Sequence, residues 1–145
     1  MADAIPAFRP DGYLPEGIHK CTEADLRPRF GSQNRRRRRL AVRIGNWLKL
    51  GKAVHARRLL IDGSFVTAKE EPDDVHAVIL LPSDFKRQVD QGIEAALELE
   101  QMFLTRQPEE IFAAEDETDF GSWCEFFSRT RGTDGRRKGL LEIAL

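Results

Sequence analysis

The sequence has little that would place it in a membrane or stabilise it with disulfide bonds. No apolar run approaches the roughly 20 residues that a membrane-spanning helix needs. The N-terminus lacks both the basic start and the apolar stretch of a signal peptide. The two cysteines, Cys21 and Cys124, are too few for a disulfide framework, which predicts reduced thiols. We therefore expect a cytoplasmic protein that makes no contact with a membrane.

Several common catalytic motifs are also missing. The sequence has no Gly-x-x-x-x-Gly-Lys loop of the kind that binds phosphates in P-loop enzymes, and no Gly-x-Ser-x-Gly elbow of a serine hydrolase. Its three histidines, His19, His55 and His76, lie too far apart in sequence for a local zinc motif. These absences exclude the P-loop and serine-hydrolase classes.

The composition is that of a folded globular chain. Hydrophobic residues make up 41% of the 145 residues and charged residues 32%, which excludes collagen-like and wholly disordered proteins. A chain of this length usually forms one compact core. We expect a single domain over residues 1–145.

Charge is unevenly distributed along the chain. Residues 1–62 carry 14 lysines and arginines against 6 acidic residues, whereas residues 63–145 carry 9 against 18. Two complementary layers of one domain account for this split better than a nucleic-acid surface does. The run Arg35 to Arg39 is typical of a solvated helix start, because a helix spreads five side chains around more than one turn. Nucleic acid is therefore the least favoured partner.

The first third of the chain predicts an arm and two helices. Three prolines favour an extended arm over residues 1–21. Thr22, followed three residues later by Asp25, predicts a capping box and a short helix. An amphipathic helix with apolar residues at helical spacing is expected to begin after Ser32 and end near Gly51.

The remainder alternates between strands and helices. Short apolar runs predict strands at 58–62, 75–81, 111–114 and 140–145. Helical spacing predicts a turn of helix at 65–69 and longer helices at 83–104 and 119–129, and Thr-Asp-Gly predicts a turn at 133–135. This order of elements predicts an α/β or α+β fold in which helices pack on a small sheet.

The connection between the first two of these strands carries the most chemical information. Gly63 allows a tight turn, and Ser64 opens a short helix whose free amides would suit a phosphate. Asp74, at the start of the next strand, is expected to point to the same place, where a divalent metal ion would bridge it to phosphate oxygens. Lys69 is placed to reach a phosphate, although a lone exposed lysine is more often solvated.

At this segment the sequence resembles the nucleotidyltransferases of the DNA-polymerase-beta type. Their motif is an apolar residue, Gly, then Gly or Ser, a short spacer and Asp/Glu-x-Asp/Glu; here nine residues separate Ser64 from Asp74. The blocks IPAF, GYLPEGIH, DGSFVTAKE and GRRKGLLEIAL also resemble a group of small bacterial proteins assigned to that superfamily. This second resemblance covers nearly the whole chain.

The resemblance implies a mixed sheet backed by helices and transfer of a nucleoside monophosphate from a nucleoside triphosphate to an acceptor. It implies that Gly63 and Ser64 bind the triphosphate and that Asp74 binds Mg²⁺ or Mn²⁺. A third carboxylate from a later strand would complete such a site. Glu110 and Glu142 are both candidates, and the sequence does not choose between them.

The sequence departs from the family pattern at His76, which stands where the second carboxylate belongs. Alternation along a strand places the side chains of Asp74 and His76 on one face and that of Asp73 on the other. A neutral imidazole suits zinc, copper, iron or nickel better than magnesium. We therefore expect that His76 serves as a metal ligand in an altered site, or that catalysis has been lost.

Two plainer interpretations stay open. Gly63 and Ser64 form only a structural turn in one of them, with His76 bonded to a backbone carbonyl. In the other, the protein is a non-catalytic interaction module on the same fold, which binds nucleotide weakly or not at all and acts through a protein partner. Small proteins of the resembled superfamily often pair with helical partners, including toxin and antitoxin pairs, and the resemblance implies such a context here.

Overall fold

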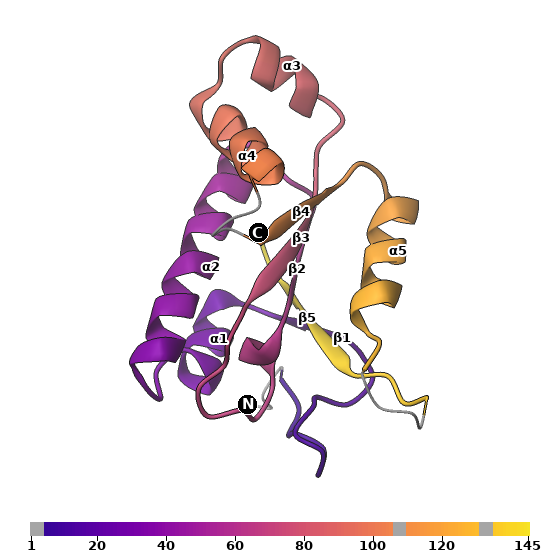
Figure 1. Ribbon diagram of the computed structural model, residues 1–145. Helices are drawn as coiled ribbons and strands as arrows, with labels where there is room; N and C mark the ends of the chain where they lie inside the picture. The colour runs from indigo at the N-terminus through magenta and orange to yellow at the C-terminus, as the bar shows by residue number, and fades with distance from the viewer. Residues whose placement is uncertain (1–4, 106–109, 131–134) are drawn as a thin grey trace.

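A five-stranded mixed sheet forms the centre of the molecule in the computed structural model, which describes residues 5–105, 110–130 and 135–145 (Figure 1). In spatial order the strands are β1 (Gly17–Cys21), β5 (Gly139–Ile143), β2 (Arg58–Asp62), β3 (His76–Leu80) and β4 (Ile111–Ala114). The outer pairs β1–β5 and β3–β4 are parallel, while β2 runs antiparallel to both of its neighbours. The predicted α+β class is confirmed.

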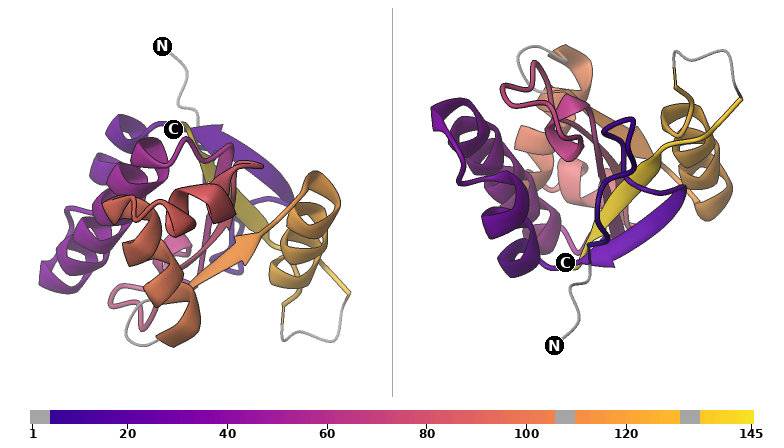
Figure 2. Two further views of the ribbon diagram at one scale, coloured as in Figure 1. Left: turned by 90° about the horizontal axis from the view of Figure 1, so that it is seen from above. Right: turned by 90° about the horizontal axis from the view of Figure 1, so that it is seen from below.

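Helices cover both faces of this sheet (Figure 2). One face is covered by α1 (Glu23–Phe30), α2 (Arg35–Ala53) and α4 (Glu94–Thr105), with α3 (Phe85–Asp90) packed beside α4. The other face is covered by α5 (Glu117–Phe127). Within the described part of the chain, no helix combines the length and the apolar character needed to cross a membrane.

Strand alternation divides the apolar side chains between the two faces. Leu59 and Ile61 of β2 join a large cluster with the α2 side chains, including Trp47, whereas Leu60 joins a smaller cluster with Phe120 of α5. All five side chains are at most 1% exposed. Full burial of each stabilises the fold by roughly 1.5–3 kcal/mol, so the central strands are fixed from both sides.

The N-terminal segment differs from the predicted arm. Residues 5–16 contain no helix or strand, but Gly17–Cys21 form β1 and pair with β5, so the extended arm ends before residue 17 rather than at 21. The amide of Gly139 donates to the Leu14 carbonyl, and that of Ala68 donates to the Gly12 carbonyl. The arm is thereby bound to the start of β5 and to the β2–β3 connection.

The helix starts follow the rules of capping only in part. The capping box of Thr22 and Asp25 is present, as predicted. The second helix is capped by Asn34 rather than Ser32, because the Asn34 side chain accepts the amide of Arg37. It also extends two residues beyond Gly51, the predicted end.

The predicted helix over 83–104 is wrong in one respect, because it is interrupted. Gly92 adopts a positive φ of 74°, which ends α3 and lets α4 begin at Glu94. Gln88 donates to the Val54 carbonyl and so attaches α3 to the end of α2. The turn expected at 133–135 lies largely outside the described residues.

Both cysteines are free and buried. Burial raises the pKa of the Cys21 thiol to about 12 and also raises the pKa of Cys124. A thiol with such a pKa has almost no thiolate at neutral pH. Neither cysteine is therefore suited to act as a nucleophile.

Candidate metal centre

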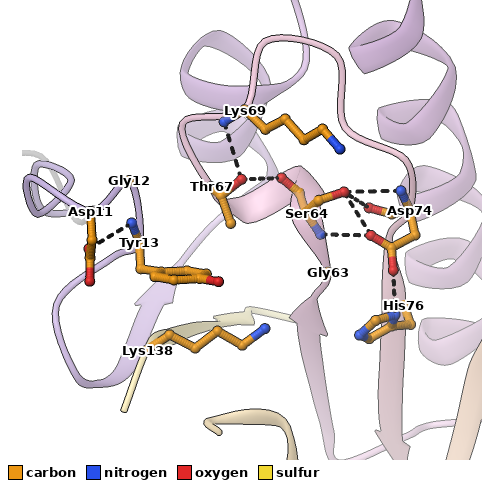
Figure 3. A pocket seen from close by; sticks show the side chains of 10 residues that line it. All are labelled: Asp11, Gly12, Tyr13, Gly63, Ser64, Thr67, Lys69, Asp74, His76 and Lys138. Carbon is orange, nitrogen blue, oxygen red and sulfur yellow. Dashed lines mark hydrogen bonds and ion pairs between the residues drawn. The ribbon is translucent and has the colours of Figure 1, made fainter. Parts of the chain in front are cut away.

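A pocket of about 540 Å³ lies where β2 ends and β3 begins (Figure 3). Three segments that are distant in sequence meet there. Tyr13 comes from the N-terminal arm, Ser64 and Lys69 from the β2–β3 connection, His76 from β3, and Lys138 from the residue before β5. The pocket therefore depends on the folding of the whole sheet.

The turn that follows β2 packs closely against the backbone of Asp74. Gly63 has a φ of 105°, and a Cβ added there would lie 2.9 Å from the Asp74 carbonyl oxygen. Only glycine satisfies both conditions without strain. The predicted helical turn over 65–69 is instead a three-residue 3-10 helix, Ser64–Val66, so the positive end of a longer helix does not face the pocket.

Ser64 and Asp74 lie side by side, as their spacing predicts. The Ser64 amide and hydroxyl donate to Asp74 Oδ1 at 2.8 and 2.7 Å. Burial disfavours the charged carboxylate, but these two hydrogen bonds, together with the charges of His76 and Lys138, lower the pKa of Asp74 overall. The amide expected to receive a phosphate is thus engaged by Asp74, whose other oxygen, Oδ2, faces His76.

Asp74, His76 and Glu110 form a cluster that could hold a metal ion. Nδ1 of His76 lies 3.5 Å from Asp74 Oδ2 and 3.3 Å from Glu110 Oε2, and the three atoms are all within 4.8 Å of one another. Asp74 lies two residues before β3, and its carboxylate still faces the ring of His76, the first residue of that strand. Glu110 directly precedes β4, which is the parallel neighbour of β3. We refer to these three residues as the candidate metal centre.

A fourth group, Asp62, was not identified from the sequence. Its side chain is 2% exposed, and Oδ2 accepts from His76 Nε2 at 3.3 Å and from Lys138 Nζ at 3.1 Å. The buried Oδ1 has no hydrogen-bond partner among the described residues. The antiparallel register places Asp62 opposite His76, and this pairing of the two strand ends was the signal that could have identified it.

The His76 ring is held between acidic groups and an aromatic side chain. Its centroid lies 4.7 Å from that of Phe127 in α5. Burial disfavours the imidazolium, but the hydrogen bond and charge of Asp62, with the charge of Asp74 and the hydrogen bond to Glu110, raise the pKa of His76 overall. The ring is therefore fixed with one nitrogen toward Asp62 and the other toward the candidate metal centre.

The structure brings Glu110 to the site but not Glu142. The carboxylate of Glu142 is bound by Arg58, with contacts of 2.6 and 3.0 Å. Glu142 pairs with Leu60 in the middle of β2, and its carboxylate is bound to Arg58 at the end of β2 remote from Asp62. Of the two candidate glutamates, Glu110 therefore lies beside Asp74 and His76, whereas Glu142 is bound by Arg58.

The two lysines of the pocket differ in their partners. Lys69 is half exposed and forms an ion pair with Asp73, whose side chain is 78% exposed. Lys138 is mostly buried and is bound to Asp62. The basic segment before β5 thus contributes one cation to the interior of the site.

The arginine run is not simply a solvated helix start. Arg37 is 5% exposed, and its guanidinium donates to the backbone carbonyls of Phe30, Phe65, Thr67 and Lys69. Arg36 donates to two further carbonyls, those of Pro72 and Asp73. These bonds attach the start of α2 to the β2–β3 connection. Arg38 and Arg39 are exposed, as predicted.

In a comparison with known protein families, residues 6–144 match a family of unknown function, DUF6932. The chain belongs to this family. The match includes every residue of the candidate metal centre, together with Asp62 and Lys138. Neither a curated protein nor a solved structure showed a significant match. The family description assigns no activity, so the function is argued from the site.

The residues present fit a divalent cation. Two carboxylates and one imidazole provide one ligand atom each, which is the number of protein ligands in many catalytic metal sites. The second ring nitrogen of His76 contacts the carboxylate of Asp62, an arrangement that commonly orients metal-binding histidines. Asp74 and His76 also line the pocket, so a bound metal would be accessible to a ligand there.

Proposed function

We propose that the protein binds a nucleoside triphosphate together with a divalent metal ion in this pocket. We further propose that it is a nucleotidyltransferase-like protein in which transfer supported by Mg²⁺ is slow or absent. One observation carries the proposal: the Gly63–Ser64 turn lies against Asp74, with His76 and Glu110 beside it at a pocket containing two lysines.

The size and charge of the pocket suit a nucleotide. Ligand sites commonly have volumes of roughly 300–1,000 Å³, and this pocket has about 540 Å³. Asp74, His76 and Glu110 would hold the metal, which neutralises charge on phosphate oxygens when bound. Lys69 and Lys138 line the same pocket and would attract the remaining phosphate charge.

His76 accounts for the expected weakness of transfer with Mg²⁺. Two-metal phosphoryl transfer depends on negative ligands that hold both ions near the reacting oxygens. An uncharged imidazole at one of these positions removes a charge and favours softer metals. The binding of nucleotide and metal is therefore retained in this proposal, while the rate of transfer with Mg²⁺ is reduced.

The two glutamates provide a matched test. Thermal unfolding would be measured with ATP, CTP, GTP or UTP, each with MnCl₂ or MgCl₂, for the natural protein and for Glu110→Gln and Glu142→Gln. A ligand that binds only the folded state at 100 times its Kd stabilises by about 2.7 kcal/mol. We expect at least one triphosphate to raise the Tm with Mn²⁺, and Glu110→Gln to remove this rise.

The Glu142→Gln variant is the control, because it makes the same chemical change at the other end of β2. It should lower the basal stability through the lost Arg58 contact but keep the nucleotide-dependent rise in Tm. An equal loss in both variants, or no rise with any triphosphate and metal, would contradict the proposal. Rapid nucleotidyl transfer with Mg²⁺ would contradict our interpretation of His76.

A second candidate function is a non-catalytic module that binds a protein partner. It is favoured by Phe126 of α5, which is 55% exposed and packs edge-on against Trp123. Exposed aromatic side chains often contribute to interfaces. Copurification from the native source would identify the partner. In this interpretation Phe126→Ser removes the partner without changing the fold, and Glu110→Gln does not.

A further inference from the structure

We infer that the candidate metal centre binds a first-row transition-metal dication in preference to Mg²⁺, through Nδ1 of His76, and that buried Asp62 positions this imidazole. The inference deepens the proposed function, because it concerns the metal of the same site. It rests on the Asp62–His76 contact and on the position of the unpartnered Asp62 oxygen, neither of which requires a nucleotide.

The orientation of the His76 ring selects its ligating atom. The two nitrogens of an imidazole point in different directions, and here Nε2 faces Asp62 whereas Nδ1 faces Asp74 and Glu110. When Nε2 donates its hydrogen to Asp62, the lone pair of the neutral ring is on Nδ1. That lone pair and the two carboxylate oxygens then converge within 4.8 Å. A cation at this place interacts favourably with all three.

Packing alone does not account for Asp62. A carboxylate that is only 2% exposed and has one oxygen without a donor is unfavourable for folding. Lys138 offsets its charge, and the bond to His76 places it behind the imidazole rather than among the ligand atoms. This is the position of the outer carboxylate that orients a metal-bound histidine. Asp62 is thus a positioning residue, not a ligand.

The donor set determines the choice of metal. Mg²⁺ prefers oxygen ligands in near-ideal octahedral geometry and gives up its water reluctantly. Imidazole suits Zn²⁺ and other borderline transition metals better than Mg²⁺, and Mn²⁺ has the lowest affinity of the first-row transition-metal dications for such a site. Phe127 covers the His76 ring, so the ring is largely shielded from water. The arrangement holds a nitrogen donor in place of the oxygen that Mg²⁺ would favour.

Metal binding can be measured without any nucleotide. Calorimetric titration of the full-length protein with MnCl₂, ZnCl₂ and MgCl₂ should give one Zn²⁺ per chain, with a Kd at least 100-fold lower than that for Mg²⁺, and a Kd for Mn²⁺ between the two. Nitrogen-15 NMR of the imidazole gives a second readout. With Zn²⁺, the Nδ1 resonance of His76 should shift more than the Nε2 resonance.

Substitution separates the role of Asp62 from a general effect of charge. Asp62→Asn should weaken Mn²⁺ binding by about 10- to 100-fold. Asp73→Asn removes the same charge from the exposed neighbour of Asp74 and should change the Kd less than twofold. His76→Asp provides a variant that leaves Asp62 intact. It converts the ligand atoms to oxygen and should reduce the preference for Mn²⁺ over Mg²⁺ at least tenfold.

Three outcomes of these experiments would each overturn the inference. Equal affinity for Mg²⁺ and Mn²⁺, a Zn²⁺ shift confined to Nε2, or equal effects of Asp62→Asn and Asp73→Asn would each contradict it. Failure of the proposed function gives a different pattern, because the metal then binds with the expected preference but no triphosphate raises the Tm. Nucleotide binding supported equally by Mg²⁺ and Mn²⁺ would leave the proposed function standing and reject this inference.

Discussion

Two buried charged side chains, Arg37 and Asp62, lie on either side of the Gly63–Ser64 turn and differ in how their polar atoms are satisfied. The guanidinium of Arg37 donates to four backbone carbonyls and binds α2 to the β2–β3 connection. The carboxylate of Asp62 uses one oxygen for His76 and Lys138, while its other oxygen has no described partner. Both side chains are at least 95% buried.

This difference indicates that Arg37 and Asp62 have different roles. A buried charge whose donors are matched by backbone acceptors stabilises a local conformation. A buried charge with an unmatched oxygen destabilises the fold, and such groups concentrate at functional sites. Arg37 is therefore assigned to the fold and Asp62 to the candidate metal centre. Substitutions at each position can test this division, beginning with the largest expected effect.

Arg37→Met should give the largest loss of stability. The methionine retains much of the buried volume but leaves four carbonyls without their donor, which we expect to lower the free energy of unfolding by about 3–5 kcal/mol. Chemical denaturation with urea measures the change. Arg39→Met is the matched control, because Arg39 is exposed on the same helix and its replacement should change stability by less than about 0.5 kcal/mol. Similar losses of stability in the two variants would contradict the assignment of Arg37 to the fold.

Gly63→Ala should give the next largest loss. Alanine at a positive φ is strained, and its Cβ would also contact the Asp74 carbonyl oxygen, so we expect a loss of about 2 kcal/mol or more. Gly92→Ala tests the backbone effect alone, since Gly92 also has a positive φ but no described atom within 4 Å of such a Cβ. Equal losses would show that the backbone of Asp74 and Val75 does not constrain the turn.

Asp62→Asn should affect stability less than Arg37→Met does, although both residues are buried. The amide has the shape of the carboxylate, can still accept from His76 or Lys138, and removes an incompletely paired charge. We expect a change of about 1 kcal/mol or less in the free energy of unfolding. A loss as large as that of Arg37→Met in the same denaturation experiment would assign Asp62 to the fold instead.

Substitutions in the exposed part of the arginine run should have the smallest effect, which would be on affinity for nucleic acid. Arg36 and the buried Arg37 bind the β2–β3 connection, whereas Arg35, Arg38 and Arg39 are the other exposed arginines of the run. Replacement of these three by glutamine should change single-stranded RNA binding less than twofold, because little binding is expected. Fluorescence polarisation at low and high salt measures it. Tight, salt-sensitive binding that the substitution abolishes would contradict this expectation.

The sequence was sufficient for those parts of the fold and site that depend on local spacing. The turn and the spacer predicted contact between Ser64 and Asp74, and alternation predicted that His76 shares the face of Asp74. The capping box at Thr22 needs only two residues three positions apart. Each of these features is determined within one short segment.

The features that were missed depend on residues distant in sequence. Asp62 and Lys138 are 76 positions apart, and their ion pair requires β5 to lie beside β2. Within the arginine run nothing distinguishes Arg37 until the β2–β3 connection folds over it. The choice between Glu110 and Glu142 likewise depends on strand order, which local periodicity does not determine.

The central claim is that a metal ion and a nucleoside triphosphate share the pocket beside Ser64. A crystal structure with Mn²⁺ and a non-hydrolysable triphosphate analogue, with anomalous scattering recorded for manganese, tests it most directly. Our account predicts an anomalous peak bound by Asp74 Oδ2, His76 Nδ1 and Glu110 Oε2, with phosphate oxygens on its pocket side. A peak elsewhere, or an analogue bound away from these three residues, would contradict it.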